Sequence, residues 1–446
     1  LDRFRQIEPK AMIAVDGYHY SGKAHDRRAL VGELLGELPS VAHLILLPTL
    51  DPAAGVTGFA NATTWADATA GNAPLQVEHV PFDHPLWVVY SSGTTGLPKP
   101  IVHSQGGVVI EHVKAINFHL DLGPGDRYHW YSTTGWMMWN FQVGGLLAGC
   151  TICLFDGNPG YPDLNALWRF VGDKRVDFFG AGAAFYASCQ KAAIDPNNGV
   201  DLSALRGLGS TGSPLSPENY RWLLDNVRSD LWINPISGGT DLVSAFIGGV
   251  PTLPMHVGEM QCRCLGAKIE AFDEAGQPLT DAVGELVCTA PMPSMPLYFW
   301  NDKDNLRYID SYFDTYPGIW RHGDWVRITP RGGAIIYGRS DATINRYGIR
   351  MGTSELYRAV EDLPEVLDSM VVDLEYLGKE SYMPLFVVLR PGEALTAALT
   401  ATIRERIKVA LSARHVPNDI FQVPAIPRTL TGKKLELPIK KLLLGQ

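Results

Sequence analysis

The sequence predicts an α/β fold, followed by a β-rich section and then a smaller α+β domain. Over 1–257, short apolar segments alternate with helical patterns, which is typical of a mixed or parallel, doubly wound sheet covered on both faces. Over 258–338 this alternation stops, and apolar segments follow one another with only turns between them. Over 339–446 the order becomes helix, strand, strand, helix. A chain of 446 residues is long enough for two or three domains.

The first predicted elements are two strands on either side of a helix. "AMIAV" (11–15) and "AHLILL" (42–47) are apolar segments that predict buried strands. Between them, "DRRALVGELLGEL" (26–38) has the apolar spacing of a helix. The predicted apolar face of this helix consists of Leu30, Val31, Leu34, Leu35 and Leu38.

The same alternation continues through the middle of the chain. Further strands are predicted at 86–90, 127–132 ("RYHWYS"), 151–155 ("TICLF"), 176–182 ("VDFFGAG") and 231–234 ("LWIN"). Helices are predicted at 111–118, 136–149, 164–174 and 217–227. In the β-rich section the strands are "AKIEAFDEAGQPL" (267–279) and "GELVCTA" (284–290). The last domain is predicted from a helix at 354–363, strands at 369–377 and 383–389, and a helix at 399–415.

Composition excludes several classes of protein. The net charge of −9 and the lack of a basic run before the last stretch argue against nucleic acid or an anionic membrane as a partner. Six cysteines are too sparse for a disulfide framework, so we expect free thiols in the cytoplasm. "CRC" (262–264) matches no standard zinc spacing. No apolar run is long enough to cross a bilayer, and no secretory signal is visible.

"YSSGTTGLPKP" (90–100) predicts an anion-binding loop. Its glycines allow backbone N–H groups to converge on one point, while the hydroxyls add donors and the lysine adds positive charge. It lacks the Gly-Lys-Ser/Thr ending of the Walker loop, and its position after a strand argues against a plain surface loop. The residues expected to hold the polyphosphate of a nucleotide are Ser91, Ser92, Gly93, Thr94, Thr95, Gly96 and Lys99.

"GLGSTG" (207–212) matches the dinucleotide fingerprint, and Asp230 follows at a suitable distance. No apolar strand leads directly into Gly207, and prolines keep a helix from opening at the last glycine. Ser216 has the features of the N-cap of the next helix. An NAD-binding oxidoreductase therefore stays an alternative, from a different enzyme class, to an enzyme that binds a nucleotide polyphosphate in the loop at 90–100.

Three more motifs are ambiguous when each is taken alone. "SGGTD" (237–241) follows an apolar strand and fits either a ligand site or a buried turn. "WRHGDWV" (320–326) places Asp324 where it either accepts from two ribose hydroxyls or caps a turn. In "PRTLTGKK" (427–434), an isolated Lys433 would most often be a solvated surface lysine.

Seven motifs in one order resemble the adenylate-forming acyl-CoA synthetases. They are "YSSGTTGLPK", "GSTGSP", "SGGTD", "GELVC", "WRHGDW", "GRSDATINRYGIR" and "TLTGKK". "AVDGYHYSGKAHDRRALVGEL", "STTGWMMWN" and "TGKKLELPIKK" are most similar to the acetoacetyl-CoA synthetases within that superfamily. The resemblance implies a large domain (1–257 with the β-rich subdomain 258–338) and a small mobile domain (339–446). Only 89 residues precede Tyr90, so we expect the large domain to lack its N-terminal portion.

The resemblance also implies roles for individual residues, with ATP, Mg²⁺ and coenzyme A as cosubstrates. Nucleotide contacts beyond the phosphate loop are implied for Gly212, Ser213, Pro214, Ser237, Gly238, Gly239, Thr240, Asp324, Arg339 and Arg350. Asp241 is implied as the magnesium ligand, and Tyr347, Gly348 and Lys408 as contacts of coenzyme A. The implied catalytic residues are Lys433, Thr240 and Asp341, of which Asp341 is the hinge of the small domain. Lys433, delivered by that domain, would stabilise the charge that builds when a carboxylate attacks the α-phosphate.

The implied acid is acetoacetate, with propionate or butyrate as rivals. Acetate enzymes carry a bulky tryptophan where Gly238 stands, so its loss is expected to deepen the acyl pocket. The other expected walls are Ser132, Thr133, Thr134 and Trp136. A carrier-protein-dependent adenylation domain is a further alternative. A lysine acyltransferase and deacylase acting on Lys433 are possible partners, because acylation would remove its charge.

Overall fold

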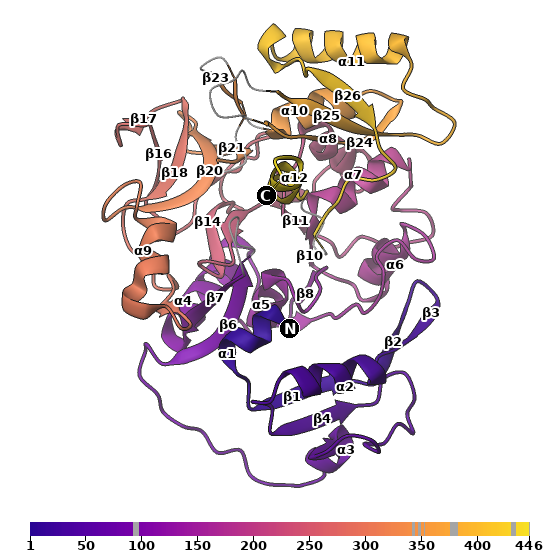
Figure 1. The fold of residues 1–446 in the computed structure, drawn as a ribbon, viewed down its shortest axis with the longest axis vertical. Helices are drawn as coiled ribbons and strands as arrows, with labels where there is room; N and C mark the ends of the chain where they lie inside the picture. The colour runs from indigo at the N-terminus through magenta and orange to yellow at the C-terminus, as the bar shows by residue number, and fades with distance from the viewer. Residues whose placement is uncertain are drawn as a thin grey trace.

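The structure is a computed structural model that describes residues 1–91, 98–340, 344–346, 349–351, 353–374, 382–429 and 434–445. Figure 1 shows the N-terminal unit at the bottom, a parallel sheet in the middle, a β-rich unit on the left and the C-terminal unit at the top. No helix among the described residues combines the length and the apolar character that a membrane crossing requires.

The central sheet has the strand order β12-β11-β10-β8-β9, and all its neighbouring strands are parallel. This confirms the doubly wound α/β prediction, because parallel neighbours require crossover connections. The strands are β8 (Arg127–Trp130), β9 (Thr151–Ile152), β10 (Phe178–Gly182), β11 (Gly207–Thr211) and β12 (Trp232–Pro235). The helices between and around them are α4 (Gln105–Lys114), α5 (Met137–Gly144), α6 (Ala166–Asp173), α7 (Ala183–Lys191) and α8 (Pro217–Asn226).

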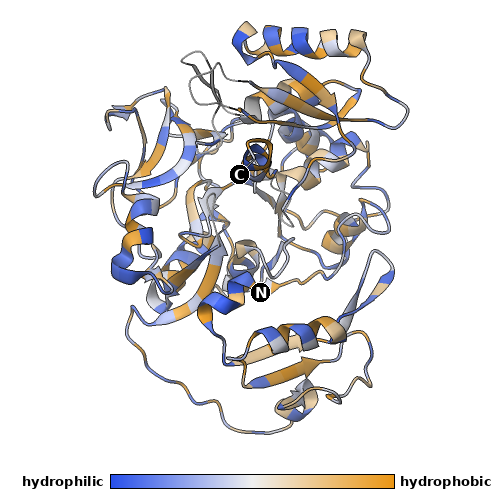
Figure 2. Ribbon diagram, viewed as in Figure 1, coloured by the Kyte–Doolittle hydropathy of each residue, from blue (hydrophilic) through white to orange (hydrophobic). Residues whose placement is uncertain are grey.

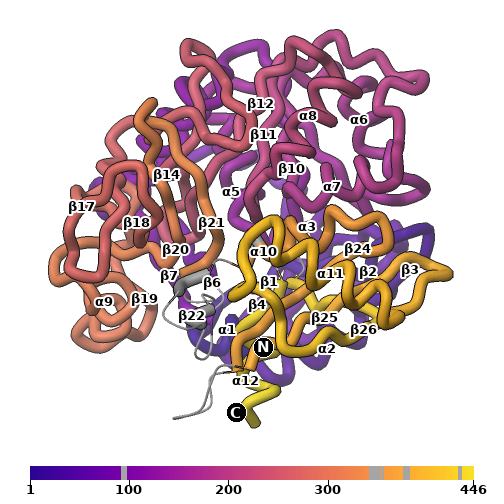
Figure 3. Tube along the Cα trace, turned by 90° about the horizontal axis from the view of Figure 1, so that it is seen from above, coloured from indigo at the N-terminus to yellow at the C-terminus, as the bar shows by residue number. Residues whose placement is uncertain are grey.

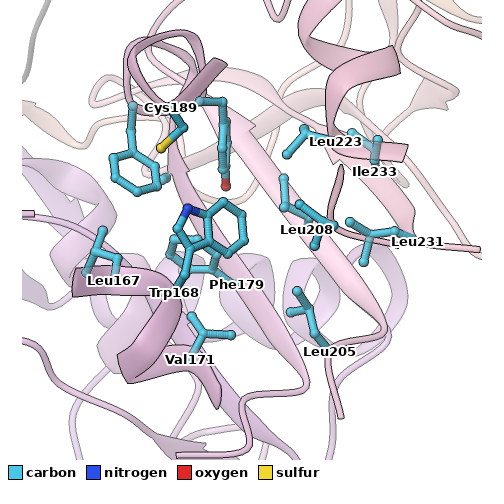
Figure 4. Close-up of a cluster of buried hydrophobic side chains, with 14 of the residues drawn as sticks. Leu167, Trp168, Val171, Phe179, Cys189, Leu205, Leu208, Leu223, Leu231 and Ile233 are labelled. Carbon is cyan, nitrogen blue, oxygen red and sulfur yellow. The ribbon is translucent and has the colours of Figure 1, made fainter. Parts of the chain in front are cut away.

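Adjacent residues of β10 supply two different hydrophobic cores. Phe179 packs with Trp168 of α6 and Leu223 of α8 on one face of the sheet, and Figure 4 shows the centre of this cluster. Phe178 packs with Trp130 and Phe141 on the opposite face. Successive side chains of a strand point to opposite faces, so one sheet is covered on both sides.

β11 differs from expectation, because "GLGST" forms a strand in the interior of the sheet rather than a loop. A Cβ added to Gly207 would lie 2.5 Å from the ring of Phe178, and one added to Gly209 would lie 2.5 Å from Trp130. The glycines therefore leave room for aromatic rings of the neighbouring strands. Ser216 is the N-cap of α8, with its Oγ accepting from Asn219 N at 3.1 Å, as predicted. Helix α7, which the sequence pattern did not predict, follows β10 directly.

The N-terminal unit has a parallel sheet of order β1-β4-β5. In Figure 2, β4 is drawn mostly in the colour of hydrophobic residues, in agreement with the predicted buried strand. Val31 of α2 and Leu38, the residue that follows this helix, are buried, whereas Leu30 is 45% exposed and does not belong to the buried face that was predicted. Leu30 is one residue, or about 100°, around the helix from Val31. The elements are α1 (Asp2–Ile7), β1 (Ala11–Val15), β2 (Gly17–Tyr20), β3 (Lys23–Asp26), α2 (Arg28–Glu37), β4 (His43–Leu47), β5 (Ala62–Thr64) and α3 (Trp65–Ala68).

Three antiparallel sheets join the central sheet to the β-rich unit. Their orders are β19-β7-β6, β13-β14-β15 and β17-β16-β18-β20-β21. The first two contain β6 (Pro85–Ser91), β7 (Lys99–Ser104), β13 (Ser237–Gly239), β14 (Ser244–Gly248), β15 (Cys262–Arg263) and β19 (Tyr298–Phe299). The third contains β16 (Ile269–Phe272), β17 (Pro278–Leu279), β18 (Val283–Cys288), β20 (Trp320–Ile328) and β21 (Ala334–Arg339), and α9 (Leu306–Tyr312) precedes β20.

The C-terminal unit has its own hydrophobic core. Leu356 and Val360 of α10 and Ile403 and Ile407 of α11 cover the strands around Val387. In Figure 2, α11 alternates between the two colours, as expected for a helix with one buried face. The elements are β22 (Ile344–Arg346), β23 (Ile349–Met351), α10 (Thr353–Glu361), β24 (Val366–Val371), β25 (Pro384–Leu389), α11 (Ala397–Ala410), β26 (Asp419–Gln422) and α12 (Glu436–Leu443). Strand β26 and helix α12 were not predicted from the sequence.

Candidate active site

The segments that follow three parallel strands meet at one edge of the central sheet. The segments after β8, β11 and β12 are 131–136, 212–214 and 236–241. The carboxyl ends of parallel strands lie at the same edge, where open α/β sheets bind their ligands. Thr211 Oγ1 donates to Ile236 O at 3.0 Å and ties the second loop to the third. The structure therefore brings together the residues predicted for the adenine, the AMP and the acyl pocket.

Trp136 lies beside Gly212 at this edge. A Cβ added to Gly212 would be 3.7 Å from Trp136 Cζ2, and Gly212 has a φ of +87°, which favours glycine. Trp136 N donates to Thr133 O at 3.0 Å, and the Ser132 hydroxyl donates to the same oxygen at 3.0 Å. Thr133, Thr134 and Ser213 are exposed, so this rim is accessible to a ligand.

Gly238 has a structural role that the sequence did not indicate. An added Cβ would lie 2.0 Å from Ser244 O and 2.7 Å from the Cα of Ala245, because β13 pairs closely with β14. The space opened by the absent side chain therefore points into the neighbouring strand. At Gly239 an added Cβ would lie 2.9 Å from Cε1 of His322, which places β13 directly against β20.

Asp241 is held in its ionised form by several neighbours. Burial opposes its ionisation, but the electrostatic influence of His322, Lys99 and Arg339 favours it, and the Tyr312 hydroxyl donates a hydrogen bond to its Oδ1. The sum lowers the pKa of Asp241 below its ordinary value of 3.8. The Lys99 ammonium lies 5.5 Å from the centre of the Tyr312 ring. An anionic ligand here would meet positive charge, and a cation would meet a carboxylate.

Asp324 and Arg339 are cross-strand partners in β20 and β21. Nη1 of Arg339 lies 3.4 Å from Oδ1 of Asp324, and Nε2 of His322 lies 3.7 Å from Oδ2. Asp324 is 9% exposed, so its carboxylate is nearly buried and oriented by these groups. Such a carboxylate can accept hydrogen bonds from two neighbouring hydroxyls, as a ribose offers.

Glu285 contacts residues adjacent in sequence to Asp324 and Arg339, the candidate ribose-binding pair. Its Oε1 accepts from Gly323 N and from the Ser340 hydroxyl, both at 3.0 Å, while Oε2 lies 3.2 Å from Nε of Arg321. Burial raises the pKa of Glu285, and Arg321 opposes that effect. A cavity of about 570 Å³ lies on this side of the sheet, lined by residues that include Trp325. It lies apart from the loops at the edge of the central sheet.

His103 fixes the backbone that leads into Asp241. Its Nε2 lies 3.1 Å from Thr240 O, and its Nδ1 lies 2.8 Å from Ser294 O. The side chain is fully buried, and burial lowers its pKa. Sequence reasoning missed His103 and Tyr312, which carry no motif. His322 lies within the predicted "WRHGDW" motif, and that motif was the signal that could have identified it.

Several predicted site residues are not placed by the structure. Ser91 and Lys99 pair across β6 and β7, but the phosphate-loop residues between them lie outside the described part. Lys408 lies on α11 with its exposed ammonium 3.5 Å from Glu405, and the described structure does not join it to the Asp241 region. Of Arg350, only the strand position in β23 is described. The residues outside the described part are Ser92, Gly93, Thr94, Thr95, Gly96, Asp341, Tyr347, Gly348 and Lys433.

Asp241 is the carboxylate that the sequence motifs imply as the magnesium ligand. Among the described residues, no group of three or more histidine, cysteine, aspartate or glutamate side chains is arranged to hold a metal. Mg²⁺ commonly binds through one or two carboxylates, with waters and substrate phosphates completing its shell. An ionised Asp241 near Lys99 is compatible with that mode.

Three proteins that match this chain over its whole length carry the same name, acetoacetyl-CoA synthetase. A structure titled acetoacetyl-CoA synthetase from Streptomyces lividans is 53% identical, with a TM-score of 0.93, and covers 100% of this chain and 68% of that one. Acetoacetyl-coenzyme A synthetase of Rhizobium meliloti is 42% identical over 449 residues, covering 100% of this chain and 69% of the relative. The chicken acetoacetyl-CoA synthetase is 39% identical over 458 residues, and the match covers 100% of this chain and 68% of the chicken protein.

A more distant structure shares the fold. The anthranilate CoA ligase AuaEII, in complex with anthranoyl-AMP, is 18% identical with a TM-score of 0.81, and covers 99% of this chain and 80% of that one. The family model described as AMP-binding enzyme matches residues 2–299. This match includes the phosphate loop and all three loops at the carboxyl edge of the central sheet, and the chain belongs to the AMP-binding enzyme family.

Proposed function

We propose that this chain converts acetoacetate, ATP and coenzyme A to acetoacetyl-CoA, AMP and pyrophosphate. The acid oxygen attacks the α-phosphate, pyrophosphate leaves, and the thiol of coenzyme A then displaces AMP from the acyl-adenylate. The geometric observation that carries the proposal is the convergence of Asp324, Arg339, Asp241 and Lys99 around one region, because it offers a ribose acceptor beside phosphate-binding charges. The choice of acid rests on relatives named acetoacetyl-CoA synthetase that match the whole chain.

The nucleotide would lie across the carboxyl edge of the central sheet. Asp324 would accept from the ribose hydroxyls, while Gly212, Ser213 and Pro214 would line the adenine. Ser237, Gly239 and Thr240 would contact the AMP, whose phosphate would lie near Arg339 and Lys99. Preorganised charge of this kind lowers the barrier for a reaction that joins two anions.

Asp241 would hold Mg²⁺ together with the substrate phosphates. When bound, the ion would supply positive charge to the phosphates and help to orient them. Asp241 itself is oriented by Tyr312 and kept ionised by His322 and Lys99.

The second half-reaction would need the small domain to move. The proposed limits are 1–257 and 258–338 for the two parts of the large domain and 339–446 for the small domain. Asp341 would be the hinge, Lys433 would serve adenylation, and Tyr347, Gly348, Arg350 and Lys408 would serve nucleotide or coenzyme A binding. Sequence motifs support these roles.

Acetoacetate would occupy the rim around Ser132, Thr133, Thr134 and Trp136. The threonine hydroxyls at this exposed rim can donate to a keto oxygen. Butyrate and propionate remain the rival acids, because an apolar pocket separates single methylenes by only about 1–3 kcal/mol.

The test is AMP release with ATP, Mg²⁺ and coenzyme A, across acetate, propionate, butyrate, acetoacetate and 3-hydroxybutyrate. We expect kcat/KM for acetoacetate to exceed that for butyrate by about tenfold or more, because a site built to bind the keto group loses a hydrogen bond with butyrate. Equal values would contradict the acetoacetate assignment. NAD(H) binding without any effect of ATP would instead favour the oxidoreductase alternative.

Lys433 is also proposed as a target of a lysine acyltransferase and deacylase. Acylation would remove the charge that adenylation needs. Lys433→Gln, which mimics the neutral form, should abolish acetoacetate-dependent ATP–pyrophosphate exchange, and full exchange would refute this regulation. The free thiols of all six cysteines support a cytoplasmic setting for such chemistry.

A further inference from the structure

Lys434, the residue directly after Lys433, is enclosed by the C-terminal unit. Its Nζ lies 2.7 Å from Oε1 of Glu361 and 3.2 Å from Oδ1 of Asp368, and donates to Ser369 O. The same nitrogen lies 3.6 Å from the centre of the Tyr357 ring. The Lys434 side chain is only 12% exposed, so it is not the solvated surface lysine that an isolated motif would suggest.

The groups around Lys434 are themselves fixed. Ser369 N and Ser369 Oγ both donate to Oε1 of Glu361 at 3.0 Å. Nη2 of Arg428 lies 2.7 Å from Oδ1 of Asp368, and Arg428 and Lys434 also pair through their backbones. Asp368 therefore holds the chain on both sides of residues 430–433. We call Glu361, Asp368, Ser369 and Tyr357 the Lys434 cage.

A lysine of the central α/β unit contacts the C-terminal unit beside the Lys434 cage. Lys191, the last residue of α7, donates through Nζ to Leu367 O in β24. The negative Glu361 and Asp368 favour the charged form of Lys191, whereas the positive Lys434 and Arg390 oppose it. Figures 1 and 3 both show α7 beside β24, so the contact joins the parallel-sheet unit to the C-terminal unit.

We propose that Lys434 is a positioning residue for Lys433, and that Lys191 holds the small domain in the orientation seen here. The proposal rests on the proposed function, in which Lys433 serves adenylation. Lys434 is anchored directly after Lys433, and the Lys191 contact lies at Leu367, the residue before Asp368 of the Lys434 cage. A loss of the anchor therefore loosens the chain at Lys434, the residue next to Lys433, and a loss of Lys191 changes the balance between domain orientations. A displacement of about 1 Å from the working geometry is enough to slow a reaction by orders of magnitude.

The test compares two half-reactions in the full chain. Adenylation is followed as acetoacetate-dependent ATP–pyrophosphate exchange, and thioester formation as consumption of supplied acetoacetyl-adenylate by coenzyme A. For Lys434→Met, we expect the ratio of exchange to thioester formation to fall by about tenfold or more. Lys434→Arg, which keeps the charge, should recover part of that ratio. A ratio within about twofold of wild type for Lys434→Met would overturn the positioning role.

Lys191→Met keeps the inner ion pairs and serves where Lys434→Met fails to fold. We expect it to shift the ratio of the two half-reactions by about twofold or more, while the matched surface variant Lys174→Met leaves the ratio unchanged. A smaller shift for Lys191→Met overturns the docking role. Exchange by the wild type is the reference: if the wild type shows none with any acid, the proposed function fails, whereas normal wild-type exchange with unchanged variants defeats only this inference.

Discussion

The hydroxyl of Tyr312 donates a hydrogen bond to Oδ1 of Asp241, although 71 residues separate the two in the chain. The Tyr312 ring stacks on Trp320, with ring centres 3.6 Å apart and planes within 12°. A rigid aromatic pair from the β-rich unit therefore orients the carboxylate that follows β13. This contact joins the edge of the central sheet to the strand pair that carries Asp324 and Arg339.

We expect Tyr312→Phe to slow adenylation without unfolding the protein. Phenylalanine keeps the stacking on Trp320 but removes the donor to Asp241. A hydrogen bond to a charged group is worth about 1.5–3 kcal/mol, so the exchange rate should fall by about tenfold or more. Steady-state exchange and a thermal melt measure the two effects. An unchanged exchange rate would mean that the orientation of Asp241 by Tyr312 does not matter to the reaction.

The buried His112 should make stability depend on pH. It is 1% exposed, with Nε2 2.9 Å from Val243 O, and burial lowers its pKa to about 4 from 6.5. Because the folded protein holds this pKa below the unfolded value, the unfolded chain binds the extra proton between these two pH values. The contribution of neutral His112 to the free energy of unfolding is therefore complete above pH 6.5, and it is lost progressively as the pH falls to about 4.

His112→Gln provides the comparison, because glutamine keeps an N–H donor of similar reach. Chemical unfolding is measured at about pH 7.5 and about pH 5. The wild type should lose more stability between these values than the variant does, since His129 is present in both proteins and His112 titrates only in the wild type. Equal losses would show that His112 does not titrate between the two states as the structure implies.

Gly238→Ala should destabilise the fold rather than merely narrow a pocket. The added Cβ would lie 2.0 Å from Ser244 O, and backbone must move to accommodate it. Overpacking of this kind costs about 1–3 kcal/mol, which a denaturation midpoint detects. Gly36→Ala is the matched control, because nothing lies within 4 Å of its added Cβ and alanine favours a helix. A stable Gly238→Ala protein with a changed acid preference would restore the view that this glycine shapes the acyl pocket.

The sequence predicted those features of the fold and of the site that depend on residues close together in the chain. The alternation of apolar segments and helical spacing identified the parallel sheet, and "WRHGDW" identified the strand that carries Asp324. The glycines of β11 concealed a strand, because Trp130 and Phe178 occupy the space above them only after the sheet has formed. Nothing in the local sequence around Tyr312 indicates its contact with Asp241, since the contact depends on how α9 packs against the end of β13.

The sequence singled out Gly238 as a wall of the acyl pocket, but it did not reveal the close backbone contact that requires a glycine there. The sequence comparison with acetate enzymes suggested space for a longer acid, whereas the backbone of β14 shows why a side chain is excluded in this structure. The Lys434 cage is another case, because two adjacent lysines look equivalent in "GKK". The positions of Glu361 and Asp368 identify the second lysine, Lys434, as an anchored residue.

Asp324→Asn should lose the ability to recognise ribose hydroxyls. Asparagine keeps the size of the side chain but replaces one acceptor oxygen with a donor, beside an Arg339 guanidinium 3.4 Å away. We expect KM for ATP to rise by about tenfold or more, because hydrogen bonds to a charged acceptor are the stronger kind. Initial rates at varied ATP measure this change, with the thermal midpoint as a check on folding.

The sharper form of this prediction uses 2′-deoxy-ATP as a second substrate. If the carboxylate of Asp324 accepts from the 2′-hydroxyl, removal of that hydroxyl should cost the wild type about tenfold in kcat/KM and cost Asp324→Asn much less. The two changes would then be non-additive, which a general loss of structure would not produce. A variant that discriminates between ATP and 2′-deoxy-ATP as strongly as the wild type would place the ribose elsewhere, and would leave Asp324 only as a partner of Arg339 and His322.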